Sequence, residues 1–317
     1  MEGDLLTTTS EALGAAPPGH IASPNRRRKG RSDLRTALLF IAPSALGFLV
    51  FYLYPAIRGF YFSLTSYNLL GTPTWVGFDN FVKMPHDPMF WNALQVTVEY
   101  VVLNIGFQTV IAVGLAVLMQ RLTQSTLLRG ALLLPWLVSN VIAALVWFWL
   151  LDYQIGIVNQ FLRWLGVHPI AFFADNLWAI PTIAAVNVWR YMGYTALLVF
   201  AGIQTIPKQL YEAAAIDGST EWKSFWRITL PLLRPVLAMV LVLTITGSFQ
   251  VFDTVAVTTR GGPVNVTRVY QYYIYQKAFT EGQFGYASAL AVVLFLILAA
   301  LAALQMRLLR AGESDLA

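Results

Sequence analysis

Residues 211–231 read YEAAAIDGSTEWKSFWRITLP, a polar and charged segment that lies between two long apolar runs and ends at Pro231. The chain as a whole is 57% hydrophobic and 12% charged, whereas soluble domains carry about 25% charged residues. Apolar runs of about twenty residues are typical of helices that cross the ~30 Å hydrocarbon layer of a bilayer. The sequence therefore predicts an all-α membrane protein that keeps residues 211–231 in water.

Six apolar segments are long enough to be transmembrane helices, at residues 34–54, 92–119, 131–151, 177–205, 236–257 and 286–306. Backbone groups inside lipid must pair within their own segment, so each segment is expected to be helical. Proline and glycine are expected to break or soften three of them, at Pro43, Pro181, Gly193 and Gly247. We expect one transmembrane domain, residues 34–310, between a disordered basic tail at 1–33 and a short tail at 311–317.

The distribution of Lys and Arg predicts the orientation. If the amino terminus is cytoplasmic, fourteen of these residues lie inside, six lie outside, and Arg190 lies within a span. Cytoplasmic loops are enriched in Lys and Arg, so both termini and the loop 207–231 are predicted to be cytoplasmic in a multi-pass protein of the cytoplasmic membrane. Four tryptophans then fall near the outer interface, as an aromatic belt would: Trp91, Trp147, Trp149 and Trp178.

Several kinds of chemistry find no support in the sequence. The chain has no cysteine and only three histidines, which lie far apart, so thiolate metal sites are excluded and no metal-ligand spacing is evident. It has no GxxxxGK[ST] phosphate loop. We therefore expect no catalytic residue, no metal and no cofactor bound by this chain, and no nucleic-acid partner.

The local sequence predicts two short helices for the loop 207–231. Pro207 suits the first position of a helix, and the Ala-rich run from Lys208 to Asp217 is closed by Gly218. Ser219 is expected to cap a second helix that stops before Pro231. The small side chains and two carboxylates of the first helix fit a protein cleft. The aromatic residues of the second fit the bilayer surface equally well.

The spacing within this loop carries a specific resemblance. Glu212-Ala213-Ala214, Gly218, Ile228, Leu230 and Pro231 match all seven positions of the EAA loop of the permease subunits of bacterial ABC importers. From about residue 36 the chain resembles the carbohydrate branch of that family, close to the maltose- and glycerol-3-phosphate-type permeases. Further matching pieces are Tyr54-Pro55, Trp75 to Phe81, Leu134-Pro135, Asn187-Val188-Trp189, Leu210-Tyr211, Phe252-Asp253 and Thr259 to Pro263.

This resemblance implies the type I permease fold of ABC importers and a role as a non-enzymatic transport subunit. The implied partners are a second permease subunit that completes a heterodimer, a cytoplasmic ATPase dimer that binds ATP and Mg, and an extracytoplasmic sugar-binding protein. The loop would couple the permease to the ATPase through the following residues: Tyr211, Glu212, Ala213, Ala214, Asp217, Gly218 and Ser219.

Polar side chains in the fourth and fifth spans form a candidate substrate site. Asn187, Arg190, Tyr191 and Tyr194 share one helical stripe, and Thr244, Ser248 and Val251 share another. Polar groups inside a membrane are costly and tend to be functional, although such residues also join helices to each other. The resemblance implies that all seven face the substrate, but only Asn187 and Tyr194 keep the residue types of the maltose-type permease.

Several alternatives stay open at this point. Arg190 could pair with Asp253 or attract an anionic substrate such as glycerol 3-phosphate, and a structural or gating role is favoured. The tyrosines of the predicted outer loop 268–277 fit a sugar, a receptor domain or membrane anchoring. The leading interpretation is the import of a di- or oligosaccharide. An ion-coupled transporter would leave the loop 207–231 unexplained, and a membrane enzyme would need catalytic residues that are not evident.

Overall fold

The computed structural model of the chain describes residues 31–122 and 125–310. Most of the predicted tail 1–33 and all of the tail 311–317 lie outside these residues. Contacts divide the chain into two units, Met1–Pro55 and Ala56–Ala317. The first unit contains α1 (Arg31–Phe48) and a π-helical turn, Leu49–Leu53, which leads into α2 (Tyr54–Ser63). The stretch Ala37–Ser63 is long and apolar enough to cross a membrane and continues nine residues beyond the span expected from the sequence.

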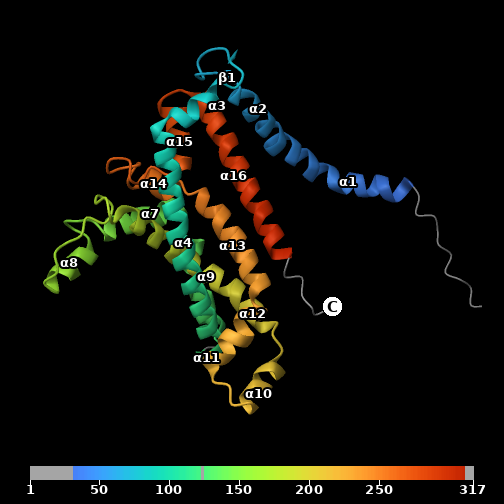
Figure 1. Ribbon diagram of the computed structural model, residues 1–317, viewed down its shortest axis with the longest axis vertical. Coiled ribbons are helices and arrows are strands. Elements are labelled where there is room, and N and C mark those ends of the chain that lie inside the picture. Colours follow the sequence, from blue (N-terminus) through green and yellow to red (C-terminus); the bar gives the residue numbers. More distant parts are fainter. Residues whose placement is uncertain (1–30, 123–124, 311–317) are drawn as a thin grey trace, which may run out of the picture. The chain divides into compact units, whose positions relative to one another are not determined.

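Four long helices form the body of the second unit (Figure 1): α4 (Pro88–Leu122), α9 (Ala179–Gln204), α13 (Arg234–Phe249) and α16 (Phe284–Arg310). Small residues allow α4 and α9 to approach closely along their length, and Ala112, Ala116 and Ala196 are fully buried there. Each helix, with α13 extended through α14 to Val257, is long and apolar enough to cross a membrane.

The third predicted span is broken in the structure. It consists of α5 (Thr126–Ala131), α6 (Leu134–Leu137) and α7 (Asn140–Leu150), and its two halves meet at 91°. The described chain therefore contains five candidate spans, or six if this bent pair counts as one. Val138 and Ser139 adopt extended backbone angles between α6 and α7, so the helical span expected over 131–151 is interrupted there.

Gly193 explains how the broken span fits against α9. A Cβ atom at this position would lie 1.8 Å from the carbonyl oxygen of Leu132, so any larger residue would push the two segments apart. The expected break of the fourth span at Gly193 is wrong, because α9 continues from Ala179 to Gln204 without interruption. The glycine serves close packing instead.

The loop after α9 contains two short helices, α10 (Lys208–Ile216) and α11 (Glu221–Ser224), joined at Gly218 with φ +71°. Thr220 caps α11 by accepting a hydrogen bond from the Lys223 N–H, which corrects the expected cap at Ser219. The second helix does not stop before Pro231. It widens into a π-helical turn, Phe225–Thr229, and continues as α12 (Leu230–Leu232). Because proline lacks an N–H and clashes with the carbonyl four residues earlier, the wider turn accommodates it.

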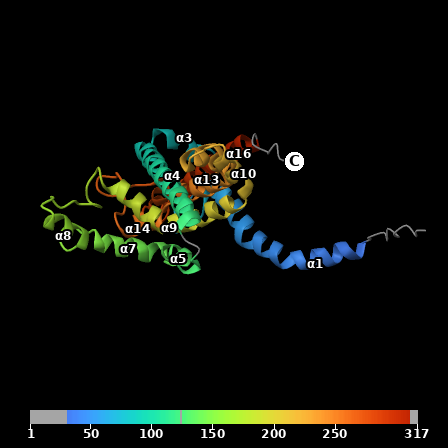
Figure 2. The ribbon, with the colours of Figure 1, turned by 90° about the horizontal axis from the view of Figure 1, so that it is seen from below.

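Along the chain, the remaining elements precede α4 or connect the long helices to one another. The strands β1 (Thr65–Ser66) and β2 (Thr74–Trp75) pair antiparallel and precede α3 (Asp79–Lys83). The helix α8 (Ile157–Trp164) lies between α7 and α9. Between α13 and α16 lie α14 (Asp253–Val257), α15 (Tyr270–Tyr275) and a π-helical turn, Gln276–Thr280. Figure 2 shows α5, α7 and α8 following one another along one side of the long helices.

Two of the four tyrosines of the loop 268–277 are internal. Tyr270 and Tyr273 are fully buried, which excludes them from a sugar-stacking surface, whereas Tyr275 remains exposed. The Tyr273 and Tyr286 hydroxyls both donate to the carboxylate of Asp87. These bonds join the segment before α4 to α15 and α16. The Lys277 ammonium lies 5.4 Å from the centre of the Tyr273 ring and pairs with Glu281 at 2.6 Å.

Asp87 gives this cluster a pH dependence. Burial raises the pKa of Asp87, but the hydrogen bonds from Tyr273 and Tyr286 and from the Met89 N–H outweigh it, so the pKa lies below its usual value. A depressed carboxyl pKa contributes stability above the unfolded-state pKa of about 3.9, and this contribution disappears as the pH falls through the folded-state pKa.

We expect Asp87→Asn to lower the free energy of unfolding at pH 7 by about 1–3 kcal/mol, since charge-assisted hydrogen bonds are lost. The difference from the parent should begin to shrink below the unfolded-state pKa of about 3.9 and disappear as the pH falls through the lower folded-state pKa of Asp87, where the folded parent carboxylate is protonated as well. Thermal unfolding in detergent between pH 3 and 7 measures both effects. Asp79→Asn, at an exposed carboxylate in the same region, is the control. A difference that does not change with pH would contradict this assignment.

Candidate functional site

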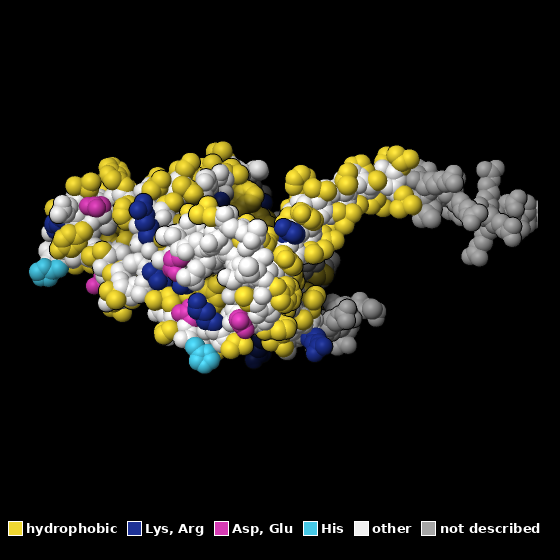
Figure 3. All heavy atoms as spheres, turned by 90° about the horizontal axis from the view of Figure 1, so that it is seen from above, with side chains coloured by type: hydrophobic (Ala, Val, Ile, Leu, Met, Phe, Trp, Pro, Cys, Tyr) yellow, Lys and Arg dark blue, Asp and Glu magenta, His cyan; other side chains and the backbone are white. Residues whose placement is uncertain are grey.

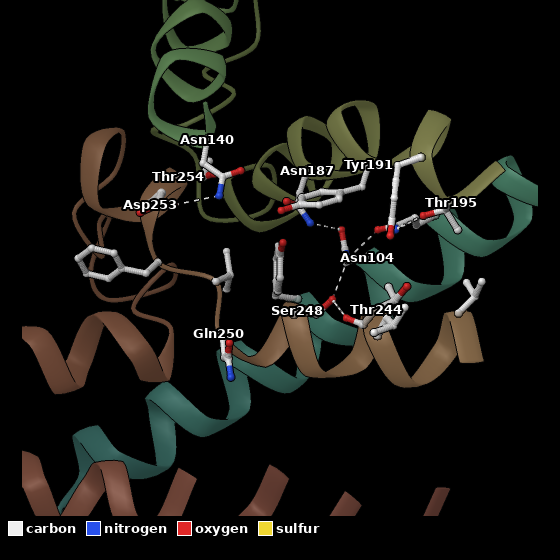
Figure 4. A pocket seen from close by; sticks show the side chains of 18 of the residues that line it. Asn104, Asn140, Asn187, Tyr191, Thr195, Thr244, Ser248, Gln250, Asp253 and Thr254 are labelled. Carbon is white, nitrogen blue, oxygen red and sulfur yellow. Dashed lines mark hydrogen bonds between the residues drawn. The ribbon is translucent and has the colours of Figure 1, made fainter. Parts of the chain in front are cut away.

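A cavity of about 170 Å³ lies between α4, α7, α9, α13 and the start of α14 (Figure 4). Amides, hydroxyls and aromatic rings dominate its lining, with Asp253 as the one ionisable carboxylate among the described residues that line it. No Lys, Arg or His belongs to that described lining. In the part of the chain that the structure describes, no three His, Asp or Glu side chains come together as a metal site.

Six of the seven residues expected to face the substrate line this cavity. They come from α9, from α13 and from the connection that follows α13: Asn187, Tyr191, Tyr194, Thr244, Ser248 and Val251. The two stripes read from the sequence therefore face each other across one space. The seventh residue, Arg190, is directed elsewhere.

A chain of buried hydrogen bonds joins three helices at the wall of the cavity (Figure 4). The Asn104 amide on α4 donates to the Ser248 hydroxyl at 2.8 Å and accepts from the Asn187 amide at 3.0 Å. One turn further along α4, the Gln108 amide donates to the Thr195 hydroxyl at 2.9 Å. Asn104, Gln108 and Ser248 are at most 4% exposed. Buried polar groups need such partners, so these bonds fix the relative rotation of α4, α9 and α13.

The sequence analysis did not identify the contribution of α4. Tyr100, Asn104 and Gln108 lie four residues apart within the second predicted span and all line the cavity. Their i, i+4, i+8 spacing puts them on one face of a helix. Polar residues repeated on one face of an apolar span are the signal that could have revealed them.

Tyr100 is the unpaired member of this set. Its side chain is fully buried, and its hydroxyl oxygen has no hydrogen-bond partner among the described residues. Leaving a buried hydroxyl unpaired costs roughly 1–3 kcal/mol. Because Tyr100 lines the cavity, a molecule bound there could supply the missing partner.

Arg190 holds the break between α6 and α7. Its Nε donates to the Val138 carbonyl at 2.8 Å, and its Nη2 donates to the Trp136 carbonyl at 3.2 Å. The guanidinium lies 4.7 Å from the centre of the Tyr191 ring. On the neighbouring turn, Trp136 stacks on Tyr194 at 4.9 Å. These contacts attach the end of α6 to α9.

The other side of the break is attached to α14. The Asn140 amide, at the start of α7, donates to the Asp253 carboxylate at 2.9 Å. The ion pair between Arg190 and Asp253 that the sequence analysis considered is not formed, since each side chain has a different partner. The break thus has one polar attachment on each side, and Asn140 and Asp253 also line the cavity.

The residues expected to couple to an ATPase divide into two groups. Glu212, Ala213, Asp217 and Gly218 are exposed, and Ala214 and Ser219 are partly covered. The Tyr211 hydroxyl instead hydrogen-bonds the Thr229 hydroxyl at 2.9 Å. The Tyr211 side chain packs against the cluster of buried hydrophobic residues that includes Val199, Ile203 and Leu233. Tyr211 therefore fastens α10 to the turn before α12, while the rest of α10 is free to meet another surface.

Comparison with known proteins identifies what this architecture resembles. Residues 108–312 match the family model of the binding-protein-dependent transport system inner membrane component. The chain is 34% identical to the sulfoquinovosyl glycerol transport system permease protein SmoG of Agrobacterium fabrum, over 89% of this chain and 92% of that protein. It is 35% identical to the lactose transport system permease protein LacF of Rhizobium radiobacter, over 84% and 91%.

Solved structures share the fold. A bacterial ABC transporter that imports the acidic polysaccharide alginate matches with a TM-score of 0.78 at 24% identity, over 89% of this chain and 99% of the other. A second structure of a bacterial alginate ABC transporter, in complex with an alginate pentasaccharide-bound periplasmic protein, matches with a TM-score of 0.76 at 24% identity, over 86% and 94%. The all-α permease fold expected from the sequence is confirmed.

We expect Arg190→Met to lower the free energy of unfolding by about 1–3 kcal/mol, because it leaves two carbonyls at the helix break without their donor. Thermal unfolding in detergent measures this change. Arg163→Met is the matched control, since Arg163 also donates to two carbonyls but lies at an exposed position where water replaces it. Unchanged unfolding together with lost substrate binding would instead assign Arg190 to the substrate.

Proposed function

Since the chain belongs to the family of binding-protein-dependent transport system inner membrane components, we propose that it is the permease subunit of an ATP-driven importer for a neutral di- or oligosaccharide. The relatives at 34% and 35% identity are permeases of carbohydrate transport systems. As in that family, the subunit resides in the inner membrane. It supplies a transport path and catalyses no reaction.

The observation that carries the substrate class is the composition of the cavity. A sugar presents hydroxyls that need both donors and acceptors, and ring faces that pack on aromatic side chains. The cavity offers amides from Asn187 and Gln250, the Thr244 hydroxyl, and the Tyr191 and Tyr194 rings, and the unpaired Tyr100 hydroxyl is buried in its wall. This set matches a polyhydroxylated ligand better than an ion or an apolar one.

The charges of the lining favour a neutral substrate. A phosphate or carboxylate ligand is normally held by Arg or Lys, and the described lining contains neither. Arg190, the nearest candidate in the sequence, donates to backbone carbonyls of the broken span. Asp253 adds a carboxylate instead of a cation. These features weigh against the glycerol 3-phosphate alternative.

In the proposed mechanism, α10 lies in a groove of a cytoplasmic ATPase dimer, which binds ATP and Mg. A second permease subunit completes the pathway, and an extracytoplasmic binding protein delivers the sugar. Closure of the ATPase dimer moves α10 and shifts the helices between outward- and inward-facing arrangements. Such coupling requires that α10 make different contacts in the two arrangements. The exposed face of α10 and both chain termini are placed on the cytoplasmic side, as the Lys and Arg distribution predicts.

We expect Gly218→Val to abolish ATP-driven uptake while the protein still inserts into the membrane. Valine strains the left-handed backbone at φ +71° by roughly 1–2 kcal/mol and adds bulk where the ATPase would dock. Sugar uptake and ATPase activity of the purified complex in liposomes measure the effect. Gly166→Val, at a glycine with φ +76° outside this loop, is the matched control. Equal loss of uptake in both variants would contradict the coupling role.

We expect Tyr100→Phe to reduce uptake roughly tenfold, the effect of losing about 1.4 kcal/mol of substrate interaction. Its stability should be unchanged or higher, because an unpaired buried hydroxyl is removed. Tyr270→Phe is the matched control, since that buried hydroxyl donates to the Leu290 carbonyl. It should lower stability and leave transport by the folded fraction intact. Uptake assays and thermal unfolding of both variants separate the two roles, and normal uptake by Tyr100→Phe would count against the site.

A further inference from the structure

The helix α8 presents its side chains in an unusual way. It connects the end of α7 at Leu150 to the start of α9 at Ala179, within a 28-residue segment between the broken candidate span and the candidate span α9. Because both neighbours are spans, α8 lies near a membrane interface whichever way the chain crosses the bilayer. Its sequence, IVNQFLRW, is strongly amphipathic.

All three polar side chains of α8 donate to the backbone around it. Asn159, which is fully buried, donates to the Asp152 and Ile170 carbonyls and accepts from the Ile170 N–H. The Gln160 amide donates to the Ile155 carbonyl at 2.9 Å. The Arg163 guanidinium donates to the Gln154 carbonyl at 3.1 Å. The polar side of the helix is therefore fastened to the protein's own loops.

The apolar side of α8 faces outward. The exposed fractions are 63% for Ile157, 56% for Phe161, 78% for Trp164 and 54% for Leu165. A helix on the surface of a soluble protein turns its apolar side to the core and its polar side to water. In α8 the apolar side is exposed instead. Val158, at the edge of that side, nevertheless packs against the cluster of buried hydrophobic residues that includes Tyr100, Ile183 and Tyr270.

This exposed face continues onto the neighbouring span. Six residues of α7 are also exposed and apolar: Val141, Ile142, Leu145, Val146, Phe148 and Trp149. Beyond α8, Val167 and Trp178 are exposed as well. Hydrophobic side chains cover much of this end of the molecule in Figure 3, where Figure 1 locates α8. A transmembrane segment whose exposed side chains are apolar faces the acyl chains of the bilayer. Because the exposed apolar face of α7 continues onto α8, we expect α8 to contact acyl chains as well.

We propose that α8 is an in-plane membrane helix whose Ile157, Phe161, Trp164 and Leu165 side chains insert among the acyl chains of the bilayer. Trp164 suits the boundary between headgroups and acyl chains, where amphipathic rings accumulate. Apolar residues on one face and polar residues on the other are the features of interfacial helices. The bonds of Asn159 fix which face meets the lipid.

In this arrangement α8 anchors the protein in the bilayer, whatever molecule is transported. The lipid contact holds the far end of α7 at the interface, while Asn140 and Arg190 hold the two sides of the break at its near end. A second protein on the same face, such as a binding protein or another permease subunit, is the competing occupant that the experiment must separate.

The absence of cysteine from the chain allows a direct test, because a single introduced cysteine is a unique labelling site. Phe161→Cys and the matched control Gln160→Cys carry an environment-sensitive nitrobenzoxadiazole fluorophore in directions about 100° apart around α8, the first on its apolar side and the second on its polar side. The full-length protein, in its assembled complex, is placed in nanodiscs of phosphatidylcholine and phosphatidylglycerol. Quenching is then measured with doxyl-labelled phosphatidylcholine included in the bilayer.

We expect doxyl lipid to quench the fluorophore at position 161 at least threefold more strongly than the one at position 160. The label at 161 should also emit at shorter wavelength in nanodiscs than water-exposed label does. Equal weak quenching at both positions would overturn the proposal. So would a blue-shifted label at 161 that lipid does not quench, since a protein partner would then cover the face.

Discussion

The amide of Asn104 is the interaction on which the arrangement of the long helices depends. Helices in a bilayer gain little from burying apolar surface against each other, because lipid is equally apolar, so packing and polar bonds decide their alignment. Asn104 joins α4 to α13 through Ser248 and to α9 through Asn187. The same side chains border the cavity, so the bonds that align the helices also shape the surface that a sugar would meet.

The broken third span places a second set of constraints on this cavity. Gly193 lets the end of α5 approach α9, and Arg190 supplies donors to carbonyls that the interrupted helix leaves unpaired. The break in turn brings Asn140 to the cavity beside Asp253. Arg190, which the sequence suggested as a substrate ligand, thus stabilises the backbone of the broken span. Asn140, which the sequence did not suggest, lines the cavity instead.

The sequence predicted the parts of the fold that depend on composition and spacing. The apolar runs identified the spans, and the stripes on α9 and α13 identified six of the residues around the cavity. The break at Val138 and Ser139 and the partners of Arg190 depend on contacts with distant segments, which a helical pattern does not contain. The passage through Pro231 was missed because a π-helical turn accommodates proline in a way that the usual helix-stop rule ignores. Tyr100, Asn104 and Gln108 recur on one face of α4, so a polar stripe of the same kind as those on the fourth and fifth predicted spans is present in the sequence of the second.

The hydrogen bond between Tyr211 and Thr229 has a mechanical consequence. It ties α10 to the turn that leads through α12 into α13, and the fully buried Leu233 anchors the same corner. We therefore expect α10 and α13 to move together, and α13 carries Thr244 and Ser248 at the cavity wall. In the proposed mechanism, a displacement of α10 would reach Ser248 through this connection and would strain the hydrogen bond between Ser248 and Asn104. The same connection would then link the position of the loop 207–231 to the shape of the cavity wall.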